Sequence, residues 1–155
     1  MPAKVKPIPD GYHTITPYLS IKGAAEAIDF YKRAFGATET MRMSHADGRV
    51  GHAELQIGDS RVMLADEFPE MNFRSPHSIG GTPVMLHMYV EDADAVVKQA
   101  VAAGATLVRP VQDQFYGDRS GSVTDPYGHV WHVSTHKEDV SMEELRKRAA
   151  AQHKG

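Results

Sequence analysis

Apolar and polar positions along the chain follow one pattern twice. Each copy opens with a short apolar segment, residues 15–21 and then residues 84–90, that predicts a β-strand. A stretch with helical spacing follows each strand, because apolar residues recur there at intervals that place them on one helix face. These residues are Ala24, Ile28, Tyr31 and Phe35 in the first copy and Ala93, Val96, Val97 and Ala100 in the second.

The two copies also match each other in register. The tripeptide Gly-Ala-Thr at residues 36–38 recurs at residues 104–106. Gly36 and Gly104 stand where a helix C-cap is expected, directly after each helical stretch. Repetition at a fixed spacing predicts two copies of one supersecondary unit.

Three further strand-like segments complete each copy. In the first copy the turn signals Asp47-Gly48 and Gly58-Asp59 separate them, and in the second copy residues 125–128, Asp-Pro-Tyr-Gly, fit a type I turn. Each copy is therefore predicted to be a βαβββ module. We expect an α+β fold in which two tandem modules form a curved, mostly antiparallel eight-stranded sheet, with a C-terminal helix.

The chain is long enough for one well-buried core and short for two independent ones. We therefore predict a single domain over residues 12–137. Its parts are module one at 12–67, a connector at 68–83 and module two at 84–137. The connector is rich in Pro and Gly and long for its position, so Phe68, Met71 and Phe73 either cover a cavity as a lid or only wrap the chain.

The two ends of the chain carry weaker signals. Residues 1–11 contain three prolines and no apolar core, which predicts a loose arm and not a secretory signal peptide. Residues 138–155 are predicted to be a helix. Ser141 and Glu144 have the spacing of a capping box, and Val140 and Leu145 occupy the hydrophobic-staple positions.

Composition narrows the function classes. A formal net charge of -3 and a charged fraction of 24% give no electrostatic reason to expect nucleic acid. The absence of cysteine excludes disulfides, zinc fingers and thiol nucleophiles and fits a cytoplasmic location. We expect no membrane span, because no apolar run approaches the roughly 20 residues that a bilayer requires. Motifs for nucleotide binding, zinc peptidases and serine hydrolases do not occur.

Strand alternation selects the polar candidates for a site. In residues 52–58, His52 and Glu54 alternate with apolar residues that face a helix, and His132 does so beside Trp131. We place His87 on the same inner face. Each histidine alone fits a structural role as well as ligand contact, whereas the set together favours a ligand site. Five other histidines, His13, His45, His77, His136 and His153, fall in predicted turns or tails and are expected to be solvated.

Three groups of residues together resemble the glyoxalase, bleomycin-resistance and extradiol-dioxygenase superfamily, also called vicinal oxygen chelate proteins. They are the segments 18–21 (Tyr-Leu-Ser-Ile), 27–31 (Ala-Ile-Asp-Phe-Tyr) and 125–131 (Asp-Pro-Tyr-Gly-His-Val-Trp). The likeness covers residues 12–137. Residues 116–119 and 135–139 are similar to the PhnB-like branch. This resemblance implies a frequent homodimer and, in the enzymes, a divalent metal held by His and Glu from four strands.

Carried over by strand position, the four metal ligands of the family fall on Thr16, Leu64, Met85 and His132. Only His132 can ligate a hard cation, so we predict no metal cofactor. A displaced site built from His52, Glu54, His87 and His132 stays open as an alternative, because imidazole and carboxylate suit zinc, nickel or iron.

The sequence is compatible with three functions. The first is a metal-independent small-molecule binding protein, with Tyr116 and Trp131 stacking on the ligand and Arg119 pairing with an acid group. Each of these residues also has a structural alternative. Tyr116 and Trp131 could lie in the core or at an interface, and Arg119 could form an ion pair with Asp118. The second is a lyase, isomerase or dioxygenase that uses the displaced metal, or His and Glu as general acid and base. The third is an interaction protein without a ligand.

Overall fold

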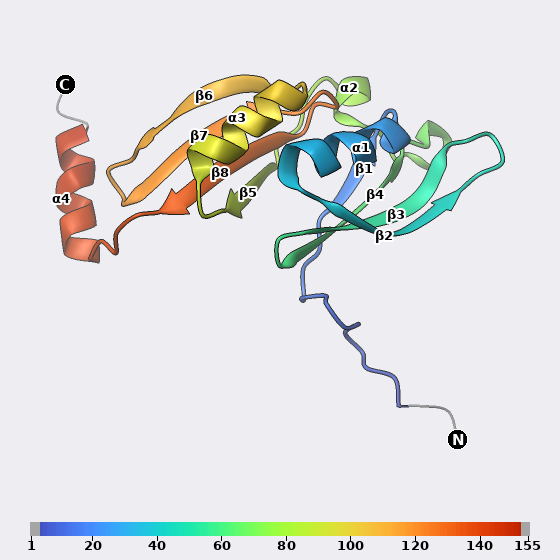
Figure 1. Cartoon of the computed structure of the whole chain (residues 1–155), viewed down its shortest axis with the longest axis horizontal. Coiled ribbons are helices and arrows are strands. Elements are labelled where there is room, and N and C mark those ends of the chain that lie inside the picture. Colours follow the sequence, from blue (N-terminus) through green and yellow to red (C-terminus); the bar gives the residue numbers. More distant parts are fainter. Residues whose placement is uncertain (1–3, 153–155) are drawn as a thin grey trace. The chain divides into compact units, whose positions relative to one another are not determined.

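The computed structural model describes residues 4–152 and divides the chain into two compact units (Figure 1). The N-terminal unit spans Met1–Gly81 and the C-terminal unit Thr82–Gly155. Each unit holds one βαβββ module, as the repeat predicts, and the boundary falls inside the predicted connector. The single-domain assignment stays a prediction. His153 and the last residues of the predicted C-terminal helix lie outside the described residues.

The N-terminal unit is a four-stranded sheet in the order β1-β4-β3-β2. The central pair β3 and β4 is antiparallel, β2 is antiparallel to β3, and β1 is parallel to β4. Strand β1 is shorter than the predicted 15–21, and Pro17, which has no N–H to donate to a ladder, directly precedes it. The elements are β1 Tyr18–Ile21, α1 Ala24–Phe35, β2 Thr38–Ser44, β3 Val50–Ile57 and β4 Ser60–Asp66.

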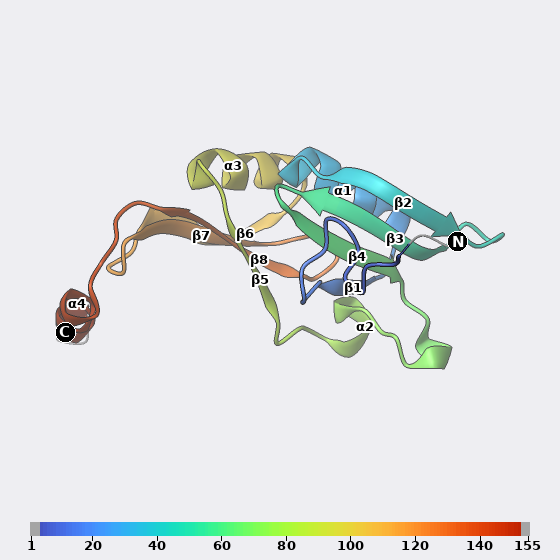
Figure 2. The ribbon, with the colours of Figure 1, turned by 90° about the horizontal axis from the view of Figure 1, so that it is seen from below.

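Helix α1 lies on one face of this sheet, and the segment that follows β4 lies on the other side (Figure 2). That segment contains a 3-10 turn, η1 Pro69–Met71, and a short helix, α2 Pro76–Ile79. The core is the face toward α1, where Leu64, Ala53 and Leu55 have no exposed surface. Helix α1 contacts both strands, and its Ile28 and Tyr31 are fully buried as well. The predicted turns at residues 47–48 and 58–59 are confirmed.

The C-terminal unit repeats this architecture with the strand order β5-β8-β7-β6. Again the first strand is parallel to the last, β5 to β8, and the other pairs are antiparallel. Helix α3 packs on β6, β7 and β8, and Trp131 is buried on that side, as predicted. The elements are β5 Met85–Tyr89, α3 Ala93–Ala103, β6 Thr106–Asp113, β7 Asp118–Thr124, β8 Val130–His136 and α4 Met142–Gln152.

In both units the end of the closing strand binds the start of the helix. The buried Asp66 at the end of β4 accepts hydrogen bonds from the backbone N–H groups of Gly23 and Ala24 at 3.1 and 2.9 Å, and from that of Val50 at 2.7 Å. In the C-terminal unit the Thr135 hydroxyl of β8 accepts from the N–H of Ala93 at 2.8 Å. These contacts satisfy donors that a helix N-terminus leaves without partners.

Replacing Asp66 by Asn should therefore destabilise the N-terminal unit. The amide has one acceptor oxygen where the carboxylate has two, and it loses the charge that strengthens three backbone hydrogen bonds. We expect a decrease of about 2 kcal/mol in the free energy of unfolding. Guanidinium denaturation followed by circular dichroism measures this change. Asp59→Asn is the matched control, since Asp59 is exposed in the β3–β4 turn; equal midpoints for the two variants would contradict the assignment.

The capping box at the start of α4 forms in part. The Ser141 hydroxyl accepts a hydrogen bond from the backbone N–H of Glu144 at 3.1 Å, so the helix starts at Met142 and not at residue 138. The Glu144 carboxylate accepts from Arg148 at 3.2 Å instead of returning to the cap.

Replacing Ser141 by Ala should weaken this helix by about 1 kcal/mol, because the N–H of Glu144 loses its acceptor. The observable is hydrogen exchange at the backbone amides of the first turn of α4, which should become faster. Ser141→Asp keeps an acceptor and should retain the protection. Unchanged exchange in the Ala variant would mean that the cap does not form in solution.

Candidate functional site

The structure separates the predicted site residues into two sets. His52 and Glu54 lie on β3 of the N-terminal unit, whereas His87, Tyr116, Arg119 and His132 belong to the C-terminal unit. Within each unit the strand alternation holds, and both sets of histidines face away from the helix of their unit. Each unit is described in turn below.

A chain of three side chains crosses the sheet of the N-terminal unit. The hydroxyl of Tyr18 lies 2.7 Å from Nδ1 of His52, and Nε2 of His52 lies 2.7 Å from a carboxylate oxygen of Glu54. Tyr18 and His52 stand on β1 and β3, which flank β4, and their rings approach to 5.4 Å between centroids. His52 and Glu54 are both about one-fifth exposed, so the chain is partly shielded from water.

Beside this chain lies a cavity of about 740 Å³. Its walls come from the sheet face, from the β2–β3 hairpin and from the segment after β4. The three side chains predicted as a lid, Phe68, Met71 and Phe73, all line it. The lining residues are Tyr18, His45, Arg49, Gly51, Ala65, Phe68, Glu70, Met71 and Phe73.

Contacts between aromatic and basic groups order one wall of the cavity. The guanidinium of Arg49 lies over the Phe68 ring at 4.6 Å, while its Nε donates to Asp47 at 2.9 Å. The His45 ring packs on Phe68 at 5.4 Å. Gly51 makes room for His45, because a Cβ at position 51 would come within 2.7 Å of the imidazole. His45 opens the predicted turn, because its carbonyl accepts from the N–H of Gly48 at 3.0 Å, and it also lines the cavity.

The segment after β4 is held down by one carboxylate. Glu67 accepts hydrogen bonds from the hydroxyls of Ser75 and Ser78, each at 2.6 Å. These bonds, that of Ser75 foremost, lower the pKa of Glu67 below its ordinary value. A backbone bridge between Phe68 and Phe73 closes the loop, and Phe73 meets the Tyr18 ring edge-on at 5.7 Å. The wall of the cavity is thus an ordered turn.

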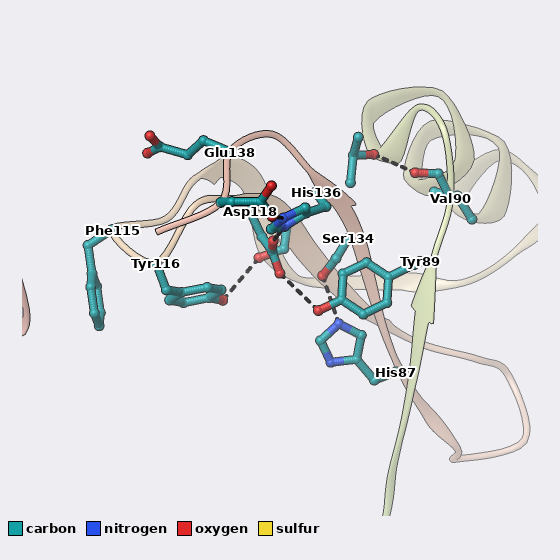
Figure 3. Close-up of polar contacts among 12 residues, drawn as sticks. His87, Tyr89, Val90, Phe115, Tyr116, Asp118, Ser134, His136 and Glu138 are labelled. Carbon is teal, nitrogen blue, oxygen red and sulfur yellow. Dashed lines mark hydrogen bonds and ion pairs between the residues drawn. The ribbon is translucent and has the colours of Figure 1, made fainter. Parts of the chain in front are cut away.

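In the C-terminal unit a buried carboxylate organises a polar cluster (Figure 3). Asp118 accepts from the hydroxyl of Tyr89 at 3.1 Å and pairs with Nδ1 of His136 at 2.7 Å. The other ring nitrogen of His136 lies 2.8 Å from Asp139. Asp118 first, and then Asp139, raise the pKa of His136 above its ordinary value. His136, expected in a turn or tail, instead ends β8; its side chain is half-exposed, as a solvated residue would be, and is bound on both nitrogens.

The predicted pair of histidines in this unit shares a face, as expected. His87 and His132 are direct neighbours on β5 and β8, with ring centroids 4.7 Å apart. Burial, followed by the charge of His87, lowers the pKa of His132. Nε2 of His87 lies 2.9 Å from the hydroxyl of Ser134, which has no exposed surface.

The remaining sequence candidates lie apart from this pair. Arg119 points to the α3 side of the sheet, where it donates to Asp94 at 2.7 and 3.0 Å and to Asp113 at 3.3 Å. The suggested Arg119–Asp118 pair is therefore wrong. The Tyr116 hydroxyl lies 3.5 Å from Ser120 (Figure 3), and Trp131 is buried with its N–H donated to Asp125 at 2.9 Å. Trp131 is thus a core residue.

Comparison with known proteins identifies the chain as one of a family. A sequence model of the "Glyoxalase/Bleomycin resistance protein/Dioxygenase superfamily" matches residues 13–133. The chain belongs to this superfamily. Among curated relatives, the uncharacterized protein Rv0887c of Mycobacterium tuberculosis is 42% identical over 144 residues, which cover 91% of this chain and 85% of the relative.

Solved structures of the superfamily fold are also similar to the chain. TioX from Micromonospora sp. ML1 is 28% identical with a TM-score of 0.63, over 84% of this chain and 99% of that one. The PhnB protein from Bacillus cereus is 21% identical, also with a TM-score of 0.63, over 79% and 99% of the two chains, and shares the fold.

The residues at the superfamily's metal positions do not fit a metal ion. Leu64 is fully buried on the side of the sheet that faces α1, so its assignment to a ligand position on the cavity face is wrong by one residue. Its neighbours Met63 and Ala65 face the cavity side. Neither of these two side chains binds a hard cation. Met85 is an exposed thioether. Among residues 4–152, no three His, Asp or Glu side chains are grouped to hold a metal.

The His136 contacts make the stability of the C-terminal unit depend on pH. Because the folded pKa of His136 is raised, its contribution is fully present below the pKa of an unfolded histidine, about 6.5. It is lost as pH rises through the folded value. The stability difference between wild type and His136→Gln should therefore be larger in mild acid than in mild alkali.

Trp131, the one tryptophan of the sequence, reports this unfolding by fluorescence within the same unit. Exposed His13 provides the control substitution, His13→Gln, which should show no such pH dependence. If the stability difference between wild type and His136→Gln were the same at every pH, the two carboxylates would not stabilise the protonated form of His136.

Proposed function

We propose that the protein binds a small molecule with a flat apolar body in the cavity of the N-terminal unit, without the usual metal of its superfamily. The observation that carries this proposal is the cavity itself, about 740 Å³ in volume and lined by Phe68, Met71 and Phe73 next to the Tyr18–His52–Glu54 chain. Ligand pockets of proteins commonly have volumes of roughly 300–1,000 Å³ and combine apolar walls with a few polar groups.

The chemistry of the walls supports this class of ligand. Phe68, Phe73 and the Tyr18 ring offer aromatic surface for stacking or edge-on contact. Tyr18, Arg49 and Glu70 are the lining residues that supply polar selectivity in this proposal. The description of the superfamily includes bleomycin resistance proteins, which agrees with binding as a function.

A second candidate function is acid–base catalysis in the same cavity. A specific observation favours it: Tyr18 lines the cavity, and its hydroxyl is joined through His52 to a carboxylate. Ligand contact by the polar face of the C-terminal unit, with His87, His132 and Tyr116, stays a further proposal, as does a role for Arg119.

Self-association is also part of this proposal. Strand β5 is an edge strand whose Met85 and Tyr89, together with the preceding Val84, are more than half exposed. Exposed apolar edge strands are surfaces that a second copy covers. We propose a homodimer in the cytoplasm; a monomer mass in light scattering would contradict the dimer. No helix within residues 4–152 is long and apolar enough to cross a membrane.

The cavity should bind the fluorescent probe anilinonaphthalene sulfonate, and Phe73→Ala should weaken this binding. Loss of one aromatic wall costs about 1 kcal/mol, so the Kd should rise roughly fivefold. A fluorescence titration measures the Kd. Binding should be the same before and after treatment with a chelator, since the wall residues need no metal.

Ile79→Ala is the matched control, because Ile79 is exposed on the same segment and does not line the cavity. It should bind the probe like wild type. Equal affinities of the Phe73 and Ile79 variants, both with native circular dichroism, would show that the probe binds elsewhere.

A further inference from the structure

The Tyr18–His52–Glu54 chain has a fixed direction. An ionised Glu54 carboxylate can only accept, so the hydrogen of the 2.7 Å contact belongs to Nε2 of His52. A neutral His52 then has an unprotonated Nδ1, which accepts the Tyr18 hydroxyl proton at 2.7 Å. The carboxylate thereby selects the tautomer of the imidazole, and the imidazole fixes the orientation of the hydroxyl.

The end of this chain opens toward bound molecules. Tyr18 is 45% exposed and lines the cavity, whereas His52 and Glu54 are largely shielded behind it. Since the Tyr18 proton points to His52, the remaining lone pairs of its oxygen are left for a ligand. The order is that of a hydrogen-bonded catalytic triad: a reacting hydroxyl, a base and a carboxylate that orients the base.

We propose that Tyr18 is a general acid–base residue, with His52 and Glu54 as positioning residues behind it, and that the N-terminal unit catalyses proton transfer on small aromatic molecules that carry an acidic C–H or O–H. The proposal rests on ligand binding in the cavity. As the substrate C–H bond breaks, its proton goes to the oxygen of Tyr18, and the Tyr18 proton goes to Nδ1 of His52. The electron pair stays on the substrate, and the imidazolium is stabilised by Glu54.

The coupling between the two protons is a physical requirement. Burial raises the pKa of Tyr18, so its hydroxyl does not ionise alone near neutral pH. Transfer to His52 in the same step removes the need for a free tyrosinate. Reversal of both transfers returns the proton to the substrate and restores the resting chain, so no oxidant or other reagent is consumed.

The C-terminal unit offers no equivalent. There, His87 contacts the hydroxyl of Ser134, but Ser134 has no exposed surface, so no substrate atom can reach it. His136 lies between two carboxylates, Asp118 and Asp139. The exposed Tyr89 hydroxyl donates to the Asp118 carboxylate and not to an imidazole. Among the residues that the structure describes, only the chain on β1 and β3 has a reachable hydroxyl bound directly to an imidazole that in turn contacts a carboxylate.

The first test needs no substrate. Nitrogen NMR of histidine-labelled protein, with His52→Gln to assign the signal, reports which ring nitrogen of His52 carries the hydrogen. In mildly alkaline buffer we expect the hydrogen on Nε2 and an unprotonated Nδ1. We also expect Tyr18→Phe to shift the Nδ1 signal, because it removes the donor. A neutral His52 with its hydrogen on Nδ1 would overturn the proposal.

The second test uses nitrobenzisoxazole as a probe of general-base catalysis. Its ring C–H loses a proton to the base, the electron pair forms the nitrile as the ring N–O bond breaks, and the product is a coloured cyanonitrophenolate. Tyr18→Phe should reduce kcat/KM about a hundredfold or more, the usual contribution of a general base. Glu54→Gln should reduce kcat and shift its pH profile while leaving the affinity for the probe nearly unchanged.

Tyr12→Phe is the matched control, because Tyr12 packs on Arg61 and does not line the cavity. It should react like wild type. Displacement of anilinonaphthalene sulfonate by nitrobenzisoxazole is measured on every variant. If the probe binds normally and wild type and Tyr18→Phe turn it over equally, proton transfer through the Tyr18–His52–Glu54 chain is wrong, while the binding function stands. If nitrobenzisoxazole does not displace anilinonaphthalene sulfonate, this counts against the binding function. The tautomer of His52 then still tests proton transfer through the Tyr18–His52–Glu54 chain.

Discussion

The buried Asp66 carboxylate is the contact on which the N-terminal unit depends. It ends β4 and binds three backbone N–H groups, two at the start of α1 and one at the start of β3. A single side chain thus fixes where the helix begins over the sheet and where two antiparallel strands align. Because β4 lies between β1 and β3, the same alignment brings Tyr18 and His52 to opposite sides of one strand. The hydrogen-bonded chain of the candidate site follows from that placement.

The C-terminal unit has the same architecture, but a different contact at the start of its helix and different polar residues. A neutral hydroxyl, Thr135, replaces the carboxylate at the start of its helix. The carboxylate of this unit, Asp118, instead faces the sheet side away from the helix, where Tyr89 and His136 bind it. The Asp118 carboxylate is therefore occupied by hydrogen bonds to other side chains of the same unit. In the N-terminal unit Tyr18, at the end of the polar chain, lines a cavity, and the proposed function rests on this difference.

Sequence patterns predicted the elements well and the site only in part. Helix caps at Gly36 and Gly104 and the facing of His52, Glu54 and His132 follow from local periodicity, and the structure confirms them. Tyr18 was visible only as part of a family motif. Its contact with His52 depends on strand order, which places residues 34 positions apart in the chain side by side, and no local pattern encodes that order.

Other differences have the same cause. Leu64 was placed at a ligand position by counting along a strand, and a shift of one residue moves a side chain from the cavity to the core. Arg119 looked available in the sequence because its partner Asp94 lies on a helix of the same unit, 25 residues away. In each case the missing information is which segments become neighbours.

A metal ion and the Tyr18–His52–Glu54 chain are two alternative means of stabilising charge on a substrate. A divalent cation stabilises developing negative charge on a substrate without moving a proton, whereas a hydrogen-bonded chain does so by moving one. Met63 and Ala65 of β4 offer no ligand for a hard cation, and the Tyr18 and His52 rings meet across this strand at 5.4 Å between centroids. In the function that we propose, charge on the substrate is therefore stabilised by proton transfer through the Tyr18 hydroxyl, which stands on the edge strand β1.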